Sequence, residues 1–118
     1  MRHVLITGGA GFIGSQVVRL LAEEDIRITV GDNPVNGSRE NIAEALGERC
    51  RLVVADVRDI AAMSALLERV DVVLHLACLG VRHSLHSPRE NHEVNATATL
   101  ELLEAARHKL EPGGVLLL

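Results

Sequence analysis

Residues 7–14 read Thr7-Gly8-Gly9-Ala10-Gly11-Phe12-Ile13-Gly14, with glycine at every third position from Gly8 onwards. This turn follows a short apolar run, residues 4–6, and precedes a stretch with apolar residues at helical spacing. Gly8 permits a tight turn, Gly11 lets a ligand approach the backbone, and Gly14 lets the helix pack closely on the strand. Such a turn at the positive end of a helix favours a dinucleotide diphosphate, the alternative being a glycine-rich turn without a ligand.

An acidic residue follows the next apolar run at the spacing expected for a ribose-binding group. Asp32 comes 18 residues after Gly14 and ends the predicted strand whose apolar run is residues 28–30. A carboxylate there accepts hydrogen bonds from an adenosine ribose and repels a 2′-phosphate, which favours NAD over NADP. Asn33 stands where NADP-binding proteins often carry arginine and points the same way, whereas the nearby Arg39 leaves NADP open. The alternative is a solvated aspartate in a turn.

Five apolar runs rich in β-forming residues alternate with helical patterns along the chain. They are Val4–Ile6, Ile28–Val30, Leu52–Ala55, Val72–Leu74 and Val115–Leu118. Continuous rather than alternating apolar runs are typical of strands that are covered on both faces. We therefore predict one α/β domain over residues 1–118, a doubly wound parallel sheet (Rossmann fold) with strand order 3-2-1-4-5. The nucleotide would lie at the switch point between the first and fourth strands.

Apolar residues at spacings of three and four predict the helices. These residues are Ile13, Val17, Leu20 and Leu21; Ile60, Met63, Leu66, Leu67 and Val70; and Val94, Ala98, Leu102 and Ala105. A shorter helix is expected over residues 40–46. Ser87, Pro88 and Glu90 predict a helix start with a capping box, and residues 112–114 (Pro-Gly-Gly) predict the end of the last helix.

Composition excludes several classes of function. The 118 residues carry a net charge of −4, whereas a nucleic-acid surface needs a basic stripe. No apolar run approaches the length of a membrane span, and the N-terminus does not match a signal peptide, so we expect a cytoplasmic protein without membrane or nucleic-acid partners. Cys50 and Cys78 lack metal-ligand spacing and are expected to be buried thiols.

The histidines offer a weak alternative site. His83, His86 and His92 could suggest a metal, but no cysteine or carboxylate completes the usual ligand spacing, so no metal is expected. His75 ends an apolar strand and is expected to be a hydrogen-bonded core histidine.

The chain resembles the N-terminal, NAD-binding part of the NAD-dependent epimerase/dehydratase family, the extended short-chain dehydrogenases/reductases that include UDP-glucose 4-epimerase. Residues 7–14 match the family's cofactor signature letter for letter, and residues 36–42 are similar to its adenosine-side segment. The resemblance implies that Asp56 and Val57 hold the adenine edge, although Asp56 could also be an ordinary turn residue beside a helix-capping Asp59. It also implies that Leu76 and Ala77 line the nicotinamide ribose and pyrophosphate. The predicted cofactor-binding residues are Gly8, Gly11, Phe12, Ile13, Gly14, Asp32, Asn33, Asp56, Val57, Leu76, Ala77 and Asn95.

The resemblance also indicates what the chain lacks. Family members move a hydride between a nucleotide sugar and NAD, with a tyrosine of a Tyr-x-x-x-Lys motif as acid and base. The sequence contains no tyrosine, so no catalytic residue is predicted. Residues 78–84 match neither the epimerases nor the dehydratases cleanly. We expect a truncated cofactor-binding portion without the C-terminal strands and substrate domain, inactive alone, with the nucleotide sugar a partner only of a complete enzyme.

The last apolar run separates this hypothesis from its alternative, a stand-alone dinucleotide-binding regulatory module. Residues 115–118 would form an apolar edge strand, which a module that functions alone should protect. We therefore expect self-association through this edge.

Overall fold

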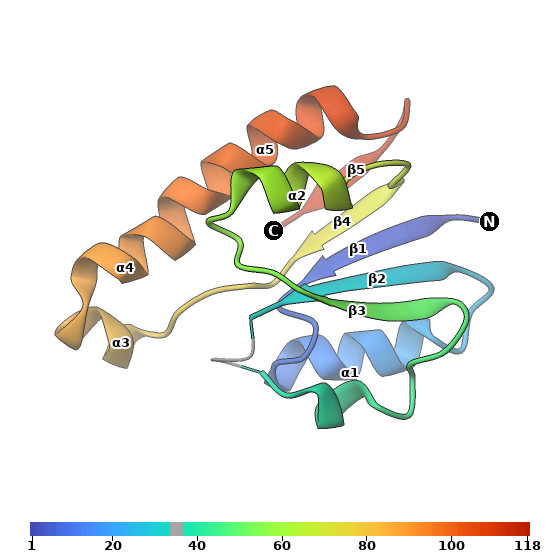
Figure 1. Cartoon of the computed structure of the whole chain (residues 1–118), viewed down its shortest axis with the longest axis horizontal. Helices are drawn as coiled ribbons and strands as arrows, with labels where there is room; N and C mark the ends of the chain where they lie inside the picture. Colours follow the sequence, from blue (N-terminus) through green and yellow to red (C-terminus); the bar gives the residue numbers. More distant parts are fainter. Residues whose placement is uncertain (34–36) are drawn as a thin grey trace.

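The computed structural model describes residues 1–33 and 37–118 and contains one sheet with helices on both faces (Figure 1). The strands are β1 (His3–Thr7), β2 (Arg27–Asp32), β3 (Cys50–Val54), β4 (Val72–His75) and β5 (Val115–Leu117). The α-helices are α1 (Phe12–Leu21), α2 (Ile60–Leu66), α3 (Val81–His86), α4 (Pro88–His92) and α5 (Ala98–Lys109). A 3₁₀ helix, η1 (Arg39–Ile42), and a π-helical turn, η2 (Glu93–Thr97), complete the described elements.

The strand order is β3-β2-β1-β4-β5 and every pairing is parallel, which confirms the predicted doubly wound sheet. Val4 of β1 lies between Ile28 of β2 and Val72 of β4. The chain therefore builds outward from β1 in one direction and then returns to build in the other. The point of reversal, between β1 and β4, is where open α/β sheets bind ligands.

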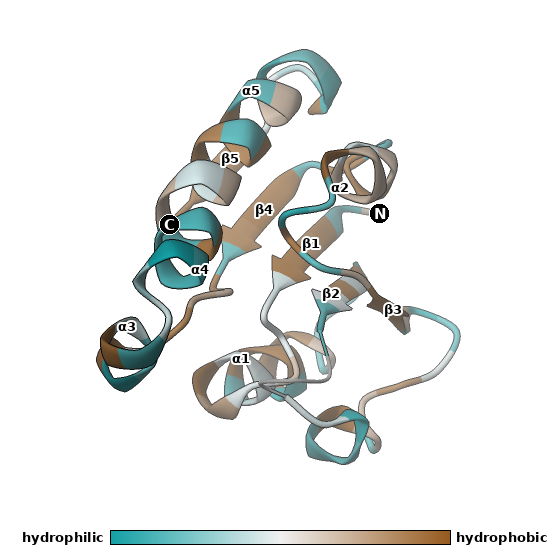
Figure 2. Cartoon of the chain, turned by 60° about the vertical axis from the view of Figure 1, so that its left-hand side comes forward, coloured by the Kyte–Doolittle hydropathy of each residue, from teal (hydrophilic) through white to brown (hydrophobic). Residues whose placement is uncertain are grey.

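The central strand has an apolar side chain on each face because each face has its own core. Leu5 packs in the cluster formed with α2 and α5, whereas Val4 and Ile6 pack in the cluster that contains Val18 of α1. Leu5 and Ile6 are fully buried. Figure 2 shows β1 and β4 mostly hydrophobic and α4 mostly hydrophilic.

The edge strands do not fit the expectation of two covered faces. Val54 of β3 is 68% exposed, and Val115 and Leu117 of β5 are 54% and 59% exposed. α1 contacts β1 and β2, so its cover does not extend across β5. A continuous apolar run therefore predicts burial on both faces only for the inner strands.

Helix α1 buries the predicted face only in part, since Val17 and Leu21 are half-buried against the core as predicted. Its buried residues are Gly14, Ser15 and Val18, while Ile13 and Leu20 are each 69% exposed. The small Gly14 and Ser15 occupy part of the buried face, and Ile13 and Leu20 turn outward. The predicted buried faces around α2 and α5 agree better with the structure. Of these predicted residues Ile60 is 51% exposed, and the following are buried: Met63, Leu66, Leu67, Val70, Val94, Ala98 and Leu102.

Two local predictions are wrong. The expected helix over residues 40–46 is only the 3₁₀ helix η1, anchored by the buried Ile42. Ser87 is the N-cap residue of α4 with Pro88 following, but its side chain makes no capping hydrogen bond within the described chain. Glu90, the other half of the expected capping box, instead pairs with Arg58 and His83. Among the described helices, none combines the length and the apolar character needed to cross a membrane.

Candidate functional site

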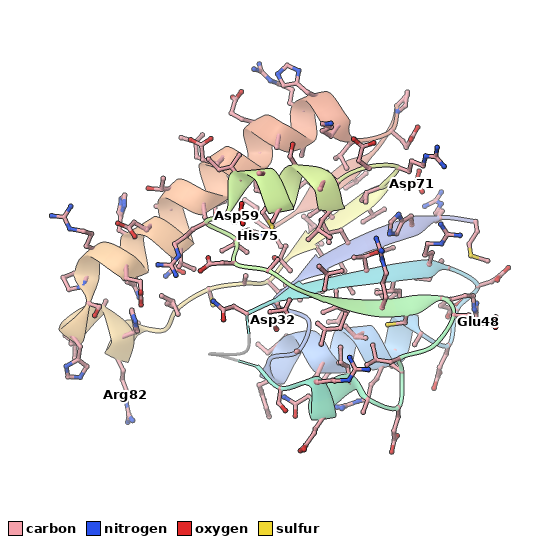
Figure 3. All side chains as sticks on the ribbon, in the orientation of Figure 1. Asp32, Glu48, Asp59, Asp71, His75 and Arg82 are labelled. Atoms are coloured by element: carbon pink, nitrogen blue, oxygen red, sulfur yellow. The ribbon has the colours of Figure 1, made fainter. Side chains whose placement is uncertain are left out.

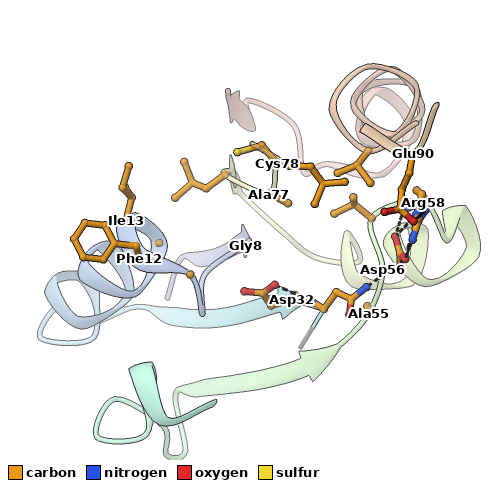
Figure 4. Close-up of a pocket in the computed structure, with 18 residues that line it drawn as sticks. Gly8, Phe12, Ile13, Asp32, Ala55, Asp56, Arg58, Ala77, Cys78 and Glu90 are labelled. Atoms are coloured by element: carbon orange, nitrogen blue, oxygen red, sulfur yellow. Dashed lines mark hydrogen bonds and ion pairs between the residues drawn. The ribbon is translucent and has the colours of Figure 1, made fainter. Parts of the chain in front are cut away.

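A cleft of about 420 Å³ opens at the carboxyl ends of the strands, beside the switch point (Figure 4). It is bounded by the β1–α1 turn, the end of β2, the segment after β3 and the segment after β4. Its size falls within the range of small-molecule and cofactor sites. The predicted site residues that line it are Gly8, Gly11, Phe12, Ile13, Gly14, Asp32, Asn33, Asp56, Val57, Leu76 and Ala77.

The first wall of the cleft is the β1–α1 turn, residues 7–14, and it depends on missing side chains. Gly8 has a φ of +70°, and a Cβ there would lie 2.7 Å from the Ala77 nitrogen. A Cβ on Gly14 would overlap the Gly8 carbonyl oxygen. Gly11 is the N-cap of α1 and has no side chain to occupy the amides of the first turn. These amides and the positive helix end therefore face a cleft that can accept an anion.

The side of the cleft formed by β2 carries an oriented carboxylate. Asp32 Oδ2 accepts a hydrogen bond from the Ala10 nitrogen at 2.8 Å, and Oδ1 accepts one from the Asn33 nitrogen at 2.7 Å. Burial raises the pKa of Asp32, while these two backbone donors oppose the shift. The carboxylate is thus fixed in direction within the cleft.

An ion-pair cluster closes the same side farther along. Arg58 Nη2 lies 2.6 Å from Asp56 Oδ2, and this pairing holds the pKa of Asp56 below its usual range. The same guanidinium reaches Glu90 at 3.3 Å and Glu93 at 3.8 Å, so it ties the segment after β3 to α4 and η2. Asp56 also accepts a hydrogen bond from the Arg58 backbone nitrogen, as an ordinary turn aspartate does, which was the alternative given for it in the sequence analysis. Asp59 caps α2 by accepting from the Ala62 nitrogen.

The second wall of the cleft is the segment after β4, residues 76–79. The Leu76 nitrogen donates to both the Thr7 carbonyl oxygen and Thr7 Oγ1, each at 3.1 Å, and the Ala77 nitrogen donates to Thr7 Oγ1 at 3.3 Å. At the other end, Asn95 Oδ1 accepts from the Leu79 nitrogen and its Nδ2 donates to the Leu79 carbonyl oxygen, both at 2.8 Å. Asn95 does not line the cleft. It lies behind this wall and holds it in place.

Several lining residues were not among the predicted cofactor-binding residues: Gly31, Ala55, Arg58, Cys78, Leu79, Glu90 and Val94. Arg58 could have been found, because it follows Asp56 by two residues in one turn. Glu90 and Val94 reach the cleft because α4 and η2 fold back over it, which no local pattern indicates. Cys78 is exposed rather than buried, because it lies in the wall, whereas Cys50 is buried as predicted.

The histidines divide into buried and surface groups. His75 is 7% exposed and hydrogen-bonded through both ring nitrogens, which confirms the predicted core histidine. His83 Nε2 lies 2.8 Å from Glu90 Oε1. Within residues 1–33 and 37–118, no three histidine, cysteine or acidic side chains are grouped so as to hold a metal ion.

Of the predicted adenosine-side segment, residues 36–42, Asn36 lies outside the described residues.

The model of the NAD-dependent epimerase/dehydratase family matches residues 4–117, which include both walls of the cleft. The chain belongs to this family. A family member from Yersinia enterocolitica, a UDP-glucose 4-epimerase, is 34% identical over 107 residues, 86% of this chain and 32% of the relative. The dTDP-glucose 4,6-dehydratase 1 of Escherichia coli is 39% identical over 111 residues, 89% of this chain and 31% of the relative.

The fold agrees with solved structures of the family. The crystal structure of Thermus thermophilus UDP-glucose 4-epimerase in complex with NAD matches with a TM-score of 0.78 and 36% identity, covering 89% of this chain and 33% of that one. The chain therefore spans about a third of the length of the epimerase/dehydratase relatives that it matches.

Proposed function

We propose that the chain binds NAD in this cleft and forms the cofactor-binding part of a nucleotide-sugar epimerase or dehydratase. The observation that carries the proposal is the pairing of two features across one opening. A backbone cradle that excludes side chains at Gly8 and Gly14 faces the fixed carboxylate of Asp32. The first suits a diphosphate and the second suits a ribose diol.

The cradle must bind the diphosphate through backbone amides. Among the described lining residues, Arg58 is the only lysine or arginine, and it is already paired with Asp56 and Glu90. The amides at the start of α1 and the helix dipole therefore supply the positive potential for the phosphates. The space that a Cβ on Gly14 would fill is taken by the Gly8 carbonyl, which keeps the turn and the helix in contact.

Asp32 supplies the preference for the ribose. Its carboxylate receives two backbone donors, and a carboxylate has about four acceptor positions in all, so acceptor positions remain for two ribose hydroxyls. The same negative charge opposes a 2′-phosphate, which favours NAD over NADP. Arg39, which left NADP open in the sequence, does not line the cleft.

NAD, when bound, supplies the hydride acceptor and donor. The residues of this chain bind and orient it, and we assign no proton transfer to them because the sequence contains no tyrosine. The nucleotide sugar is assigned to the complete enzyme. The 118-residue chain is therefore expected to leave UDP-glucose unchanged when NAD is added, and epimerisation above trace rates would contradict this assignment.

Calorimetric titration of the chain with NAD, NADP and UDP-glucose tests the proposal. We expect NAD to bind, NADP to bind more weakly and UDP-glucose not to bind. Asp32→Asn keeps the size of the side chain but removes its charge, and should weaken NAD binding by about 1.5–3 kcal/mol. Asp71→Asn is the matched control, since Asp71 Oδ2 also accepts a backbone hydrogen bond, from His3, but at the opposite end of the sheet (Figure 3). Equal losses in both variants, or none, would overturn the proposal.

We also propose that the chain associates with itself through β5. Its Val115 and Leu117 side chains are more than half exposed, and among the described strands only β4 pairs with it. Exposed apolar edges are templates for pairing with another chain. Leu117→Lys should reduce the sedimentation coefficient at high protein concentration, and an unaltered chain that stays monomeric over the same range would contradict the idea.

A further inference from the structure

We propose that His75 is a positioning residue for the cleft. It fixes the direction of the Thr7 hydroxyl, which holds the second wall at Ala77 and shares the Leu76 amide with the Thr7 carbonyl oxygen. The link to cofactor affinity rests on the proposed NAD function, whereas the link to the wall does not. Figure 3 places His75 at the carboxyl end of β4, the same end of the sheet at which Asp32 ends β2.

The hydrogen bonds around Thr7 leave one arrangement of donors and acceptors. Thr7 Oγ1 accepts from the nitrogens of Leu76 and Ala77, which occupies both of its lone pairs. The hydroxyl proton must then point to His75 Nδ1, 2.6 Å away, so Nδ1 is an acceptor. His75 is therefore neutral and carries its proton on Nε2.

The opposite side of the ring agrees with this arrangement. His75 Nε2 lies 3.0 Å from Thr99 Oγ1, and Thr99 Oγ1 donates to the Asn95 carbonyl oxygen at 2.9 Å. A protonated Nε2 can donate to Thr99, whose own proton is directed to Asn95. The series of hydrogen bonds thus runs from the end of β1 through β4 to η2. This π-helical turn carries Asn95, whose side chain is hydrogen-bonded to Leu79.

The position of the second wall matters because the first wall touches it. A Cβ on Gly8 would lie within 3 Å of the Ala77 nitrogen, the Ala77 Cα and the Leu76 carbonyl carbon, so the two walls meet here without spare room. A shift of Leu76 or Ala77 would either press on the glycine-rich turn or widen the cleft. His75 is 7% exposed and does not line the cleft, so it acts through Thr7 rather than on a ligand.

The other end of β1 offers an internal control. His3 is also buried, at 8% exposed, and its Nδ1 lies 3.3 Å from the Arg69 carbonyl oxygen, which can only accept. His3 therefore carries its proton on Nδ1, and Nε2 accepts from Thr29 Oγ1 at 2.7 Å. The two buried histidines are expected to be opposite tautomers, and only His75 is near the cleft. Burial lowers the pKa of both, which favours the neutral rings that these bonds require.

The first experiment uses the unaltered chain, so it does not depend on any variant folding. ¹⁵N NMR of the histidine rings at neutral pH should show a protonated Nε2 for His75 and a protonated Nδ1 for His3. A protonated Nδ1 on His75 would overturn the proposal, because Thr7 could not then accept from both wall amides.

The second experiment separates the two bonds of His75 by substitution. An asparagine amide can occupy the position of Nδ1 and a glutamine amide that of Nε2. In His75→Asn an acceptor for Thr7 remains, so the Leu76 and Ala77 amides should keep their slow hydrogen exchange. In His75→Gln that acceptor is lost, so the Ala77 amide should exchange faster and NAD should bind about tenfold more weakly, whereas the Leu76 amide keeps its bond to the Thr7 carbonyl oxygen. His3→Gln should leave these two amides and NAD affinity unchanged.

The readouts distinguish failure of the positioning role from failure of the proposed function. Equal exchange at Ala77 in His75→Gln and in the unaltered chain would overturn the positioning role, whatever the NAD affinity. If the unaltered chain does not bind NAD, the proposed function fails, while the tautomers and the exchange rates still decide the role of His75.

Discussion

The two walls of the cleft are built in opposite ways. The first wall, residues 7–14, works because Gly8 and Gly14 have no side chains where the backbone crowds. The second wall, residues 76–79, is held by hydrogen bonds that its backbone amides donate to the side chains of Thr7 and Asn95, far away in the sequence. A substitution in the first wall therefore creates a clash, whereas one behind the second wall removes a support. The first should be more damaging.

Gly14→Ala should have the largest effect. Its Cβ would overlap the Gly8 carbonyl oxygen, a backbone atom that cannot move without displacing the turn. We expect a loss of about 1–3 kcal/mol in the free energy of unfolding, as for overpacked sites, and no detectable NAD binding. Urea unfolding and calorimetry measure the two effects. Gly47→Ala is the control, because a Cβ there meets nothing within 4 Å, and similar damage in both variants would contradict the close-contact argument.

Asn95→Ala should have a smaller effect on the second wall. Leu79 would lose two hydrogen bonds, each with a net value of about 1 kcal/mol, and its backbone could turn to water. We expect NAD to bind more weakly but still detectably. Asn95→Asp keeps the acceptor for the Leu79 nitrogen and removes the donor. Its affinity for NAD should therefore lie between that of the unaltered chain and that of Asn95→Ala. If Asn95→Ala proved as damaging as Gly14→Ala, the contrast between the walls would fail.

Acid should weaken the fold through the buried histidines. The folded-state pKa values of His75 and His3 are lowered from 6.5 by burial, so the unfolded chain takes up protons at a higher pH than the folded chain does. Their contribution to stability is therefore present above about pH 6.5 and is lost as pH falls through the folded-state values. Urea midpoints measured across this range should fall with pH, and His75→Gln should reduce the slope. A flat profile would contradict the neutral rings.

The smallest effect expected is on thiol reactivity. Cys78 is exposed and lines the cleft beside the second wall, whereas Cys50 is buried and burial raises its thiol pKa. Alkylation followed by mass spectrometry should therefore modify Cys78 first. NAD should slow that modification and leave Cys50 unchanged, and equal rates with and without NAD would show that Cys78 lies outside the bound cofactor's reach.

The contrast between the walls also explains what the sequence could predict. Residue type and spacing alone identify the roles of Gly8, Gly11, Gly14 and Asp32. The first wall, the sheet order and the cleft were therefore predictable from the sequence. Asn95 was predicted at the cofactor, but the structure places it behind Leu79, because that depends on how η2 packs. The predicted burial of Ile13 and Leu20 in α1 and the predicted capping box were wrong for the same reason, since tertiary packing decides which side chains are covered and which partners they find.

Asp32 has a consequence for how a ligand would be received. Its two oxygens are already anchored by the amides of Ala10 and Asn33, so the carboxylate does not have to give up rotamer freedom at the moment of binding. A preorganised acceptor of this kind lowers the entropic cost of association and leaves mainly the exchange of water for ligand hydroxyls. The entropic cost of ordering this carboxylate is thus incurred during folding rather than during ligand binding.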